Sequence, residues 1–486
     1  MKIAMIASEA NPLAKSGGLA DVVSALSEEY KKQGHEAIIV IPYYKSIDNK
    51  RPSGVEIKWL GRYGVDLGWR HLEAEIYHTE INGVPYYLIG NYYYFGRPNL
   101  YGYGDDGERF AFFALASIRL LPFLEFAPDI IHVHDWQSAI IPTLLKERFH
   151  AESVYAHTHT VLTIHNPAFK GYLDPFFLND FFGLSDDLFH SGRVRFEGQV
   201  STLKSGIVDA DKITTVSPTH REELLSESLS QGLCGILRLR ENDFCGIVNG
   251  VDELEFDPKK DTRIALNFDA KNLVKGKEAC RKDLLSSADM EDNGGPIFGL
   301  VSRLTYQKGI DLILKAAHYT LDRGGNIIVL GSGEEGLENG LRYLQQFYPK
   351  QVHAHIGYSD DFAHKVYAGS DFFLMPSLFE PCGIGQLIAE KYGTLPVGRQ
   401  TGGIADTVIS YDGKNEDKAN GFLFRDYDEG GLSYAMFEAE KVYKNKTLFH
   451  KLQRNALNTD NSWGSSAKLY LGIYEELNNR NPNPKN

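Results

Sequence analysis

Two short loops of the sequence combine glycine with basic residues, which suits them to binding phosphate. The first, Lys15-Ser16-Gly17-Gly18-Leu19, lies between a predicted strand at Lys2–Ala7 and an amphipathic helix. Glycine lets the backbone approach a ligand closely, the N–H groups at a helix start attract anions, and Lys15 adds a full positive charge. A flexible connector with a surface lysine is the alternative, and a Gly-Gly pair alone does not decide between the two.

The second loop, Ser302–Gly309, follows a predicted buried strand and contains Arg303 and Lys308. Arg303 can bind a diphosphate through paired hydrogen bonds, and Lys308 can act as a point charge. The alternative is a solvated basic loop, but a position directly after a buried strand favours binding. Gly331 lies at a similar strand–helix junction, within Leu330-Gly331-Ser332-Gly333. There the glycines indicate either close approach of a ligand or a tight turn without one.

Three further polar residues stand where predicted strands end: Asp135, His165 and Glu380. In open α/β sheets ligands bind beyond the carboxyl ends of the strands, so all three are candidate site residues. A diphosphate would repel Glu380, which therefore suits sugar hydroxyls; alternatively, it satisfies the dipole of a helix N-terminus. His165 is as compatible with a structural role as with a functional one.

Two histidine pairs, at positions 132 and 134 and at 157 and 159, invite comparison with metal sites. An HxH pair places two imidazoles on the same face of a strand. No acidic residues cluster beside these pairs in the sequence, so we predict no metal site and take Asp135 as the better functional candidate.

The predicted strands and helices that carry these residues form two successive α/β segments of the chain. Lys2–Ala7, the helix that follows, and a strand at Ala37–Ile41 make a βαβ unit, which forms a parallel sheet. Residues 50–110 are less regular. Further strands are predicted at 73–77, 84–89, 130–133, 161–164, 212–216, 247–248, 297–301, 326–330, 352–356, 371–375 and 395–397. Helices are predicted at Phe110–Leu121, near Asn272–Leu285 and in about the last 30 residues, before a frayed tail at Asn478–Asn486.

The length, net charge and cysteine content of the chain limit its possible functions. With 486 residues the chain exceeds a single core of roughly 250–300 residues, so two domains are expected, with a boundary near Val251. A net charge of −13 argues against nucleic acid or an anionic membrane as the main partner. The four cysteines form no CxxC pair, and neither a signal peptide nor a membrane span is evident, which predicts a cytoplasmic protein.

Taken together, the motifs resemble the bacterial glycogen synthase and plant starch synthase family. The resemblance covers Met1 to about residue 470, and the motifs occur in the family's order. They are Lys15–Leu19 with Ala20-Asp21-Val22, His134-Asp135-Trp136, Thr163-Ile164-His165-Asn166, Asn249-Gly250-Val251-Asp252, Ser302–Gly309, Ile356-Gly357-Tyr358, Glu380-Pro381-Cys382-Gly383, and Tyr392–Pro396 with Thr401-Gly402-Gly403.

The resemblance implies the GT-B fold, in which two Rossmann-like doubly wound domains face each other across a deep cleft. We expect the first domain at residues 1–250, with 457–486 packing back onto it, and the second at 251–456. The implied activity is transfer of glucose, with retention, from ADP-glucose to the non-reducing end of glycogen or another α-1,4-glucan, with no metal or other cofactor. The resemblance leaves the oligomeric state open.

The resemblance also implies roles at matching positions. Lys15, Gly17 and Gly18 correspond to residues that contact the distal phosphate, and Arg303 and Lys308 to diphosphate ligands. The other implied site residues lie near the sugar or the nucleotide: Asp135, His165, Gly331, Tyr358 (stacked on adenine), Glu380 (on the glucose hydroxyls), Cys382 and Gly383. Two residues depart from the pattern: Gly385 stands where better-known bacterial members have Thr, and Pro167 where Leu usually follows His-Asn.

Other functions remain as alternatives. Another retaining GT-B glycosyltransferase would lack the early Lys-x-Gly-Gly-Leu, and many carry a second Glu where this chain has Ile388. A non-catalytic glucan-binding homologue should have lost Arg303, Lys308 or Glu380, and all three are present. A Rossmann dehydrogenase would need GxGxxG in the first βα turn, which is absent.

Overall fold

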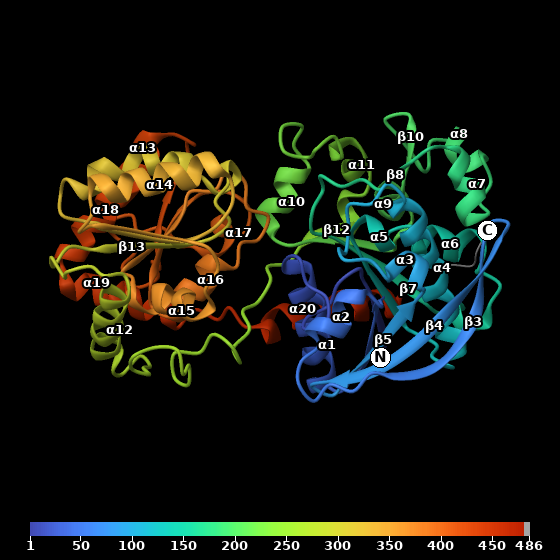
Figure 1. The fold of residues 1–486 in the computed structure, drawn as a ribbon. Helices are drawn as coiled ribbons and strands as arrows, with labels where there is room; N and C mark the ends of the chain where they lie inside the picture. The colour runs from blue at the N-terminus through green and yellow to red at the C-terminus, as the bar shows by residue number, and fades with distance from the viewer. Residues whose placement is uncertain (481–486) are drawn as a thin grey trace. The chain divides into compact units, whose positions relative to one another are not determined.

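The computed structural model describes residues 1–480 and divides into two compact α/β units, coloured along the chain in Figure 1. Unit 1 comprises Met1–Val216, Arg221–Ile247 and the C-terminal helix that starts at Trp463; unit 2 comprises Ser217–His220 and Val248–Ser462. Of the tail predicted at Asn478–Asn486, residues 481–486 lie outside the described residues, and Asn478 and Asn479 belong to the C-terminal helix.

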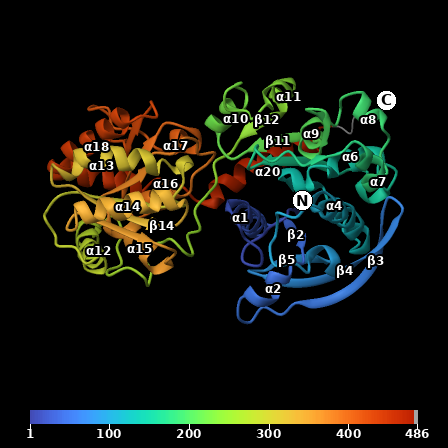
Figure 2. The ribbon, with the colours of Figure 1, turned by 45° about the horizontal axis from the view of Figure 1, so that its top comes forward.

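Unit 1 is built on a nine-stranded sheet with the order β12-β11-β7-β6-β1-β2-β5-β4-β3. The strands are β1 (Lys2–Ile6), β2 (Glu36–Pro42), β3 (Lys58–Leu67), β4 (Arg70–Ile81), β5 (Val84–Gly90), β6 (Ile130–His134), β7 (His159–Ile164), β11 (Lys212–Thr215) and β12 (Phe244–Gly246). All pairs from β12 to β5 are parallel, while β3, β4 and β5 form antiparallel pairs. Figure 2 shows β3 and β4 as the long curved ribbon at one edge.

The first βαβ unit forms because its helix has one apolar face. In α1 (Gly18–Lys32), the predicted core residues Leu19, Val22, Val23 and Leu26 are buried. Asp21 in the first turn and Lys31 and Lys32 in the last turn complement the helix dipole. β1 and β2 then pair in parallel, so the loop that carries Lys15 lies at the carboxyl end of the sheet.

The C-terminal helix α20 (Trp463–Asn479) completes the core of unit 1, although it is remote in sequence. It packs against α1, and its Trp463, Tyr470 and Tyr474 are buried among the side chains of the unit 1 core. The hydroxyl groups of Tyr30 and Tyr474 are hydrogen-bonded at 3.0 Å. Helix α20 is therefore part of the hydrophobic core of unit 1.

Unit 2 is a six-stranded, all-parallel sheet with the order β15-β14-β13-β16-β17-β18. Its strands are β13 (Ile297–Val301), β14 (Asn326–Gly331), β15 (Val352–Ile356), β16 (Phe372–Met375), β17 (Leu395–Arg399) and β18 (Phe422–Phe424). Figure 1 shows α13 (Ile310–Leu321) and α14 (Glu335–Phe347) on one side of the sheet, and α12 (Leu273–Ser287) and α15 (Asp360–Gly369) on the other. Helices on both faces make this a doubly wound, Rossmann-like sheet.

Three strands of the two large sheets depart from the sequence prediction, and a separate small sheet of β8 (Tyr172–Leu173), β9 (Arg195–Phe196) and β10 (Gln199–Ser201) was not predicted. The strand predicted at Ile247–Val248 is wrong: β12 is Phe244–Gly246, because its partner β11 ends at Thr215 and leaves Ile247 only one sheet bond, from its N–H to the Thr215 carbonyl. The structure adds β3, whose glycines and register shift between Trp59 and Gly61 obscure its alternation. It also adds the three-residue β18, which is too short to show a period.

Candidate functional site

The loop after β1 presents Lys15, Gly17 and Gly18 to solvent at the start of α1. No described atom lies within 4 Å of the position that a Cβ on Gly17 would occupy. The Lys15 ammonium pairs with Asp21 at 2.8 Å. Buried Glu9 anchors the loop, because its carboxylate accepts hydrogen bonds from the backbone N–H of Ser16 and, at 2.6 Å, from the Ser16 hydroxyl. The loop is thus fixed at its base and open at its glycines.

Asp135 and His165 are brought together at the ends of β6 and β7. Asp135 begins α5 (Asp135–Ser138) with φ 51°, a left-handed conformation that Asp tolerates better than most residues. Its carboxylate accepts the backbone N–H groups of His165 at 2.7 Å and Asn166 at 3.2 Å. Burial raises the pKa of Asp135 to about 7, despite these hydrogen bonds. Asp135 therefore fixes the backbone at which the loop after β7 starts.

His165 also belongs to a cluster of three histidines. Its Nε2 lies 3.0 Å from Nδ1 of His134, whose ring stacks on that of His132 with centroids 4.3 Å apart. Both nitrogens of His132 are engaged, Nδ1 by the Tyr474 hydroxyl at 2.7 Å and Nε2 by Thr163 at 2.6 Å. Burial lowers the pKa of His132 and of His165 to about 3 and that of His134 well below its ordinary value, so all three rings are neutral near pH 7. The His132–His134 pair thus takes part in core packing.

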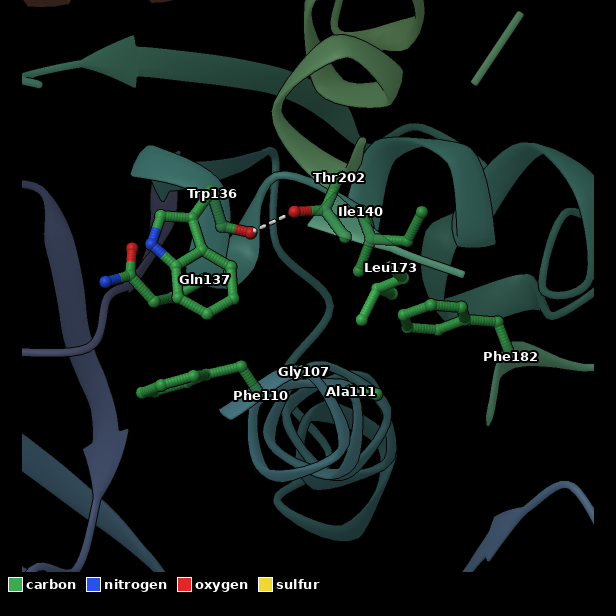
Figure 3. A pocket seen from close by; sticks show the side chains of 9 residues that line it. All are labelled: Gly107, Phe110, Ala111, Trp136, Gln137, Ile140, Leu173, Phe182 and Thr202. Atoms are coloured by element: carbon green, nitrogen blue, oxygen red, sulfur yellow. Dashed lines mark hydrogen bonds between the residues drawn. The ribbon is translucent and has the colours of Figure 1, made fainter. Parts of the chain in front are cut away.

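A small apolar pocket lies beside Trp136 (Figure 3). The Trp136 carbonyl accepts a hydrogen bond from the Thr202 hydroxyl at 2.7 Å, and the Trp136 ring meets that of Phe110 edge to face. The rest of the lining is mainly aliphatic and aromatic. The pocket offers no charged group to a phosphate, and its walls hold Trp136, the neighbour of Asp135, in place.

In unit 2, Lys308 and Glu380 form an ion pair. The Lys308 ammonium lies 2.6 Å from Glu380 Oε2, which also accepts a hydrogen bond from the Ser377 hydroxyl at 2.9 Å. Glu380 is only 6 % exposed. It stands five positions before Gly385, where α16 (Gly385–Lys391) begins, so its partners are side chains and not the helix N-terminus proposed as an alternative. The lysine offsets the negative charge of the glutamate before any ligand arrives.

Arg303 lies on the same loop but is exposed, and within residues 1–480 its guanidinium forms no hydrogen bond or ion pair. The loop runs directly over Gly331, where a Cβ would come within 1.9 Å of the Ser302 carbonyl oxygen. Gly309, with φ 73°, lies equally close to the carbonyl of Pro376. Glycine is therefore required at Gly331 and Gly309 by backbone packing, which brings Arg303, Lys308 and Glu380 to one edge of the sheet.

The segment Glu380–Cys382 packs tightly against Gly402 and Gly403. A Cβ on Gly402 would come within 1.9 Å of the Glu380 carbonyl oxygen, and one on Gly403 within 2.0 Å of that of Cys382. Cys382 is buried; its sulfur accepts the Asn249 N–H, and burial raises the pKa of the thiol to about 12. The thiol is therefore protonated near pH 7 and is a packing group in this arrangement. Gly383 follows with φ 73°.

Tyr358 follows β15 and is 86 % exposed. It lies near Gly331, because the N–H of the preceding residue, Gly357, donates to the Gly331 carbonyl at 2.8 Å.

Among the described residues, one group has the spacing of a metal site: Glu255, Asp360 and His364. The Arg263 guanidinium is hydrogen-bonded to Asp360 at 2.5 Å and lies 3.6 Å from Glu255, so a permanent cation already balances these carboxylates.

Three partners of the candidate residues were not predicted from the sequence: Glu9, His134 and Ser377. Glu9 lies three positions after the end of β1, so the strand-end rule used for Asp135 also points to it. His134 was considered as half of a metal-binding pair and as part of the motif His134-Asp135-Trp136, without a role of its own. The role of Ser377 depends on its contact with Glu380 and carries no local sequence signal.

Among residues 1–480, no helix is both long and apolar enough to cross a bilayer.

Residues 2–239 match the family model described as the starch synthase catalytic domain, and residues 283–458 match glycosyl transferases group 1. A glycogen synthase of Bacillus cereus (strain ATCC 10987 / NRS 248) is 41 % identical over 480 residues, covering 98 % of this chain and all of that protein. A glycogen synthase of Clostridium kluyveri is 42 % identical with the same coverage.

Solved structures agree with these matches. The catalytic domain of starch synthase IV from Arabidopsis thaliana, bound to ADP and acarbose, superposes with a TM-score of 0.89 at 31 % identity, covering 98 % of this chain and 99 % of that chain. A sucrose-phosphate synthase from Thermosynechococcus elongatus shares the fold alone, with a TM-score of 0.60 at 15 % identity. Two Rossmann-like units with these structural relatives define a glycosyltransferase of the GT-B class. Within that class, the chain belongs to the glycogen synthase family.

Proposed function

We propose that this chain transfers glucose from ADP-glucose to the non-reducing end of an α-1,4-glucan, with retention of configuration and release of ADP. The relatives named above are glycogen synthases, and the similar starch synthase was solved with ADP and acarbose, which supports a nucleotide and a glucan as ligands. The observation that carries the proposal is the Lys308–Glu380 ion pair, in which Lys308 lies on the same loop as the exposed Arg303. A reaction on these substrates fits the cytoplasmic location that the sequence predicts.

In this proposal, unit 2 binds the donor. Arg303 and Lys308 contact the diphosphate, Gly331 supports their loop through its close contact with Ser302, and Tyr358 stacks on adenine. Glu380 accepts hydrogen bonds from the glucose hydroxyls, which its buried position and its pairing with Lys308 support. Cys382 and Gly383 shape the backbone beside Glu380 through the tight packing on the Gly402–Gly403 pair.

Unit 1 contributes two further groups in this proposal. The loop with Lys15, Gly17 and Gly18 binds the distal phosphate, which the open space around Gly17 and the charge of Lys15 support. Asp135 and His165 lie beside the sugar. Asp135 acts by holding the His165 backbone, since its Oδ1 accepts two backbone N–H groups.

The proposed mechanism follows from charge. The bond between glucose C1 and the diphosphate oxygen breaks, so negative charge grows on the diphosphate in the transition state. Fixed positive groups placed where charge develops lower the barrier, and Arg303 and Lys308 are such groups. The acceptor hydroxyl then forms the new bond to C1 on the face from which the diphosphate departs, and the diphosphate takes the hydroxyl proton. No step in this scheme uses a metal.

Proton NMR of the products tests this proposal. We expect incubation with ADP-glucose and a maltooligosaccharide to give α-1,4-linked products and one ADP per glucose transferred. A β-linked product would contradict retention. Release of free glucose without chain growth would contradict the transferase assignment itself.

A further inference from the structure

The ring of His165 contacts the ring of His134. His134 Nδ1 lies 3.0 Å from His165 Nε2, and the two ring centroids are 5.3 Å apart. His134 is completely buried at the end of β6, directly before Asp135, which holds the His165 backbone. Two consecutive residues therefore fix both the backbone and the ring of His165.

The proton in this contact can be assigned from what surrounds His134. His134 is buried and His165 is partly buried, each ring lies next to another imidazole, and each neutral imidazole has one N–H and one bare nitrogen. Within residues 1–480, the second nitrogen of His134, Nε2, is buried and has no hydrogen-bond partner. A buried N–H without an acceptor is rarer and costlier than a bare nitrogen without a donor. Nε2 of His134 is therefore bare, and the proton is on Nδ1.

His134 cannot readily turn to change this arrangement. Its ring stacks on His132 at an interplanar angle of 27°, and His132 is anchored through both nitrogens to Tyr474 and Thr163. The His134 backbone is fixed as well, because its N–H donates to the Ser138 hydroxyl at 2.8 Å. The orientation of the donor is thus set by the core of unit 1.

We propose that His134 is a positioning residue: its Nδ1–H donates to His165 Nε2, which keeps His165 in the Nδ1–H form, so that His165 donates a hydrogen bond to a sugar hydroxyl oxygen. The inference rests on the proposed place of His165 beside the sugar. It assigns His165 as a donor and excludes it as a general base. The sugar hydroxyl keeps its own proton for another acceptor.

The test is ¹⁵N NMR of the full chain labelled in its histidine rings, near pH 7.5. Protonated and bare ring nitrogens have well separated shifts, and the His165 signals are those that vanish in His165→Ala. We expect a protonated Nδ1 and a bare Nε2 at His165. In His134→Leu this preference should be lost, and kcat should fall on the order of 10- to 100-fold, as for other groups that orient a reactive side chain.

Two variants keep the test independent of folding. His134→Asn retains an N–H donor near the Nδ1 position, so it should keep the His165 tautomer and restore kcat toward wild type. Thr143→Val loses a buried hydrogen bond to Asp209 that takes no part in the histidine cluster, so it should lower thermal stability and leave the tautomer and kcat unchanged. A proton on Nε2 of His165 in the wild type, or a wild-type tautomer and kcat in His134→Leu, would overturn the proposal. The expected tautomer together with full activity of His165→Ala would instead overturn the proposed role of His165, and the positioning role of His134 with it.

Discussion

Lys308 and Glu380 show how the candidate site combines charge with position. The glutamate is buried and would be costly to ionise alone, and the lysine beside it supplies the opposite charge at 2.6 Å. Arg303, five positions before Lys308, is exposed and unpaired within the described residues. Lys308 is thus held in place before the donor binds, and Arg303 is available to contact the donor.

We expect Arg303→Ala and Lys308→Ala each to lower kcat by about 10²–10³ and to change KM less, because charge grows on the diphosphate only as its bond breaks. The two losses should not add, since loosening the diphosphate removes part of what the second group stabilises. A double-mutant cycle on kcat with ADP-glucose and glycogen measures this, with thermal melts as a check on folding.

Lys315→Ala is the matched control for that cycle, because Lys315 is an exposed lysine on the following helix, 3.6 Å from Asp311. It should leave kcat unchanged and shift stability by at most about 0.5 kcal/mol. Losses that simply add would show that Arg303 and Lys308 act independently. Near wild-type kcat in both single variants would remove this loop from the site.

The pKa of Asp135 predicts a dependence of stability on pH. Its value of about 7 in the folded chain exceeds the usual value near 3.9, so between about pH 4 and pH 7 the folded state binds a proton that the unfolded state has released. Stability from this residue therefore falls as pH rises through that window, by up to about 4 kcal/mol. Asp135→Asn does not titrate, so its Tm should rise relative to wild type between pH 4.5 and pH 8. A Tm difference that is constant or moves the other way would contradict the assignment.

The sequence could locate the candidate residues but not most of their pairings. Asp135, His165, Arg303 and Glu380 were found because each follows a buried strand, and parallel strands end at one edge of their sheet. The Lys308–Glu380 contact joins residues 72 positions apart, and no local pattern encodes it. The same holds for Ser377 and for the backbone contacts that require Gly331 and Gly402.

Among the elements, buried parallel strands were predicted well; of the four edge strands of the two large sheets, β15 was predicted with its observed bounds, whereas β3, β12 and β18 were not. Strands such as β6 and β14 are continuous apolar runs, because both faces of a parallel sheet are covered. β12 and β18 are three-residue strands whose extent depends on where a partner ends, and the glycines of β3 interrupt its alternation. Strand limits at sheet edges are thus set by tertiary pairing.

The start of helix α16 explains one departure from the family pattern. A Cβ on Gly385 would lie 2.9 Å from the ring of Phe373 and 3.5 Å from the sulfur of Met375. Phe373 is buried on β16, so the space that a threonine at position 385 would need is filled. The choice of residue at position 385 and the position of the Phe373 ring therefore depend on each other.

We expect Gly385→Thr to lower the stability of unit 2 by about 1–3 kcal/mol through overpacking. Phe373→Leu creates space beside Gly385, so the double variant should lose less than the sum of the two single losses. Thermal melts of the three variants provide the measurement. If the losses add, or if Gly385→Thr melts like wild type, Phe373 does not determine the residue at 385.

At the scale of the whole molecule, the C-terminal helix α20 packs against the N-terminal helix α1 in the core of unit 1. Tyr474 connects Tyr30 of α1 to His132 of β6, and through the histidine cluster it backs His165. Residues from the first, the middle and the last parts of the chain thus support the same side of the candidate site in unit 1.

Tyr474→Phe should therefore lower the stability of unit 1 by about 1–3 kcal/mol, because it leaves His132 and Tyr30 buried with one partner fewer. Leu469→Ala on the same helix is the control, since Leu469 is 59 % exposed and its loss should change stability by at most about 0.5 kcal/mol. Calorimetric melts that show equal effects for both variants would refute this role of Tyr474.

If this chain extends a glucan from ADP-glucose, it must transfer radiolabelled glucose from this donor to glycogen. The transfer is measured in parallel with ADP-glucose and UDP-glucose and repeated with EDTA. We expect a higher kcat/KM for ADP-glucose than for UDP-glucose; EDTA should leave the rate unchanged, and Arg303→Ala should lower kcat by about 10²–10³. Equal or better kcat/KM with UDP-glucose would contradict the donor assignment, and absence of transfer from either donor would contradict the proposed function.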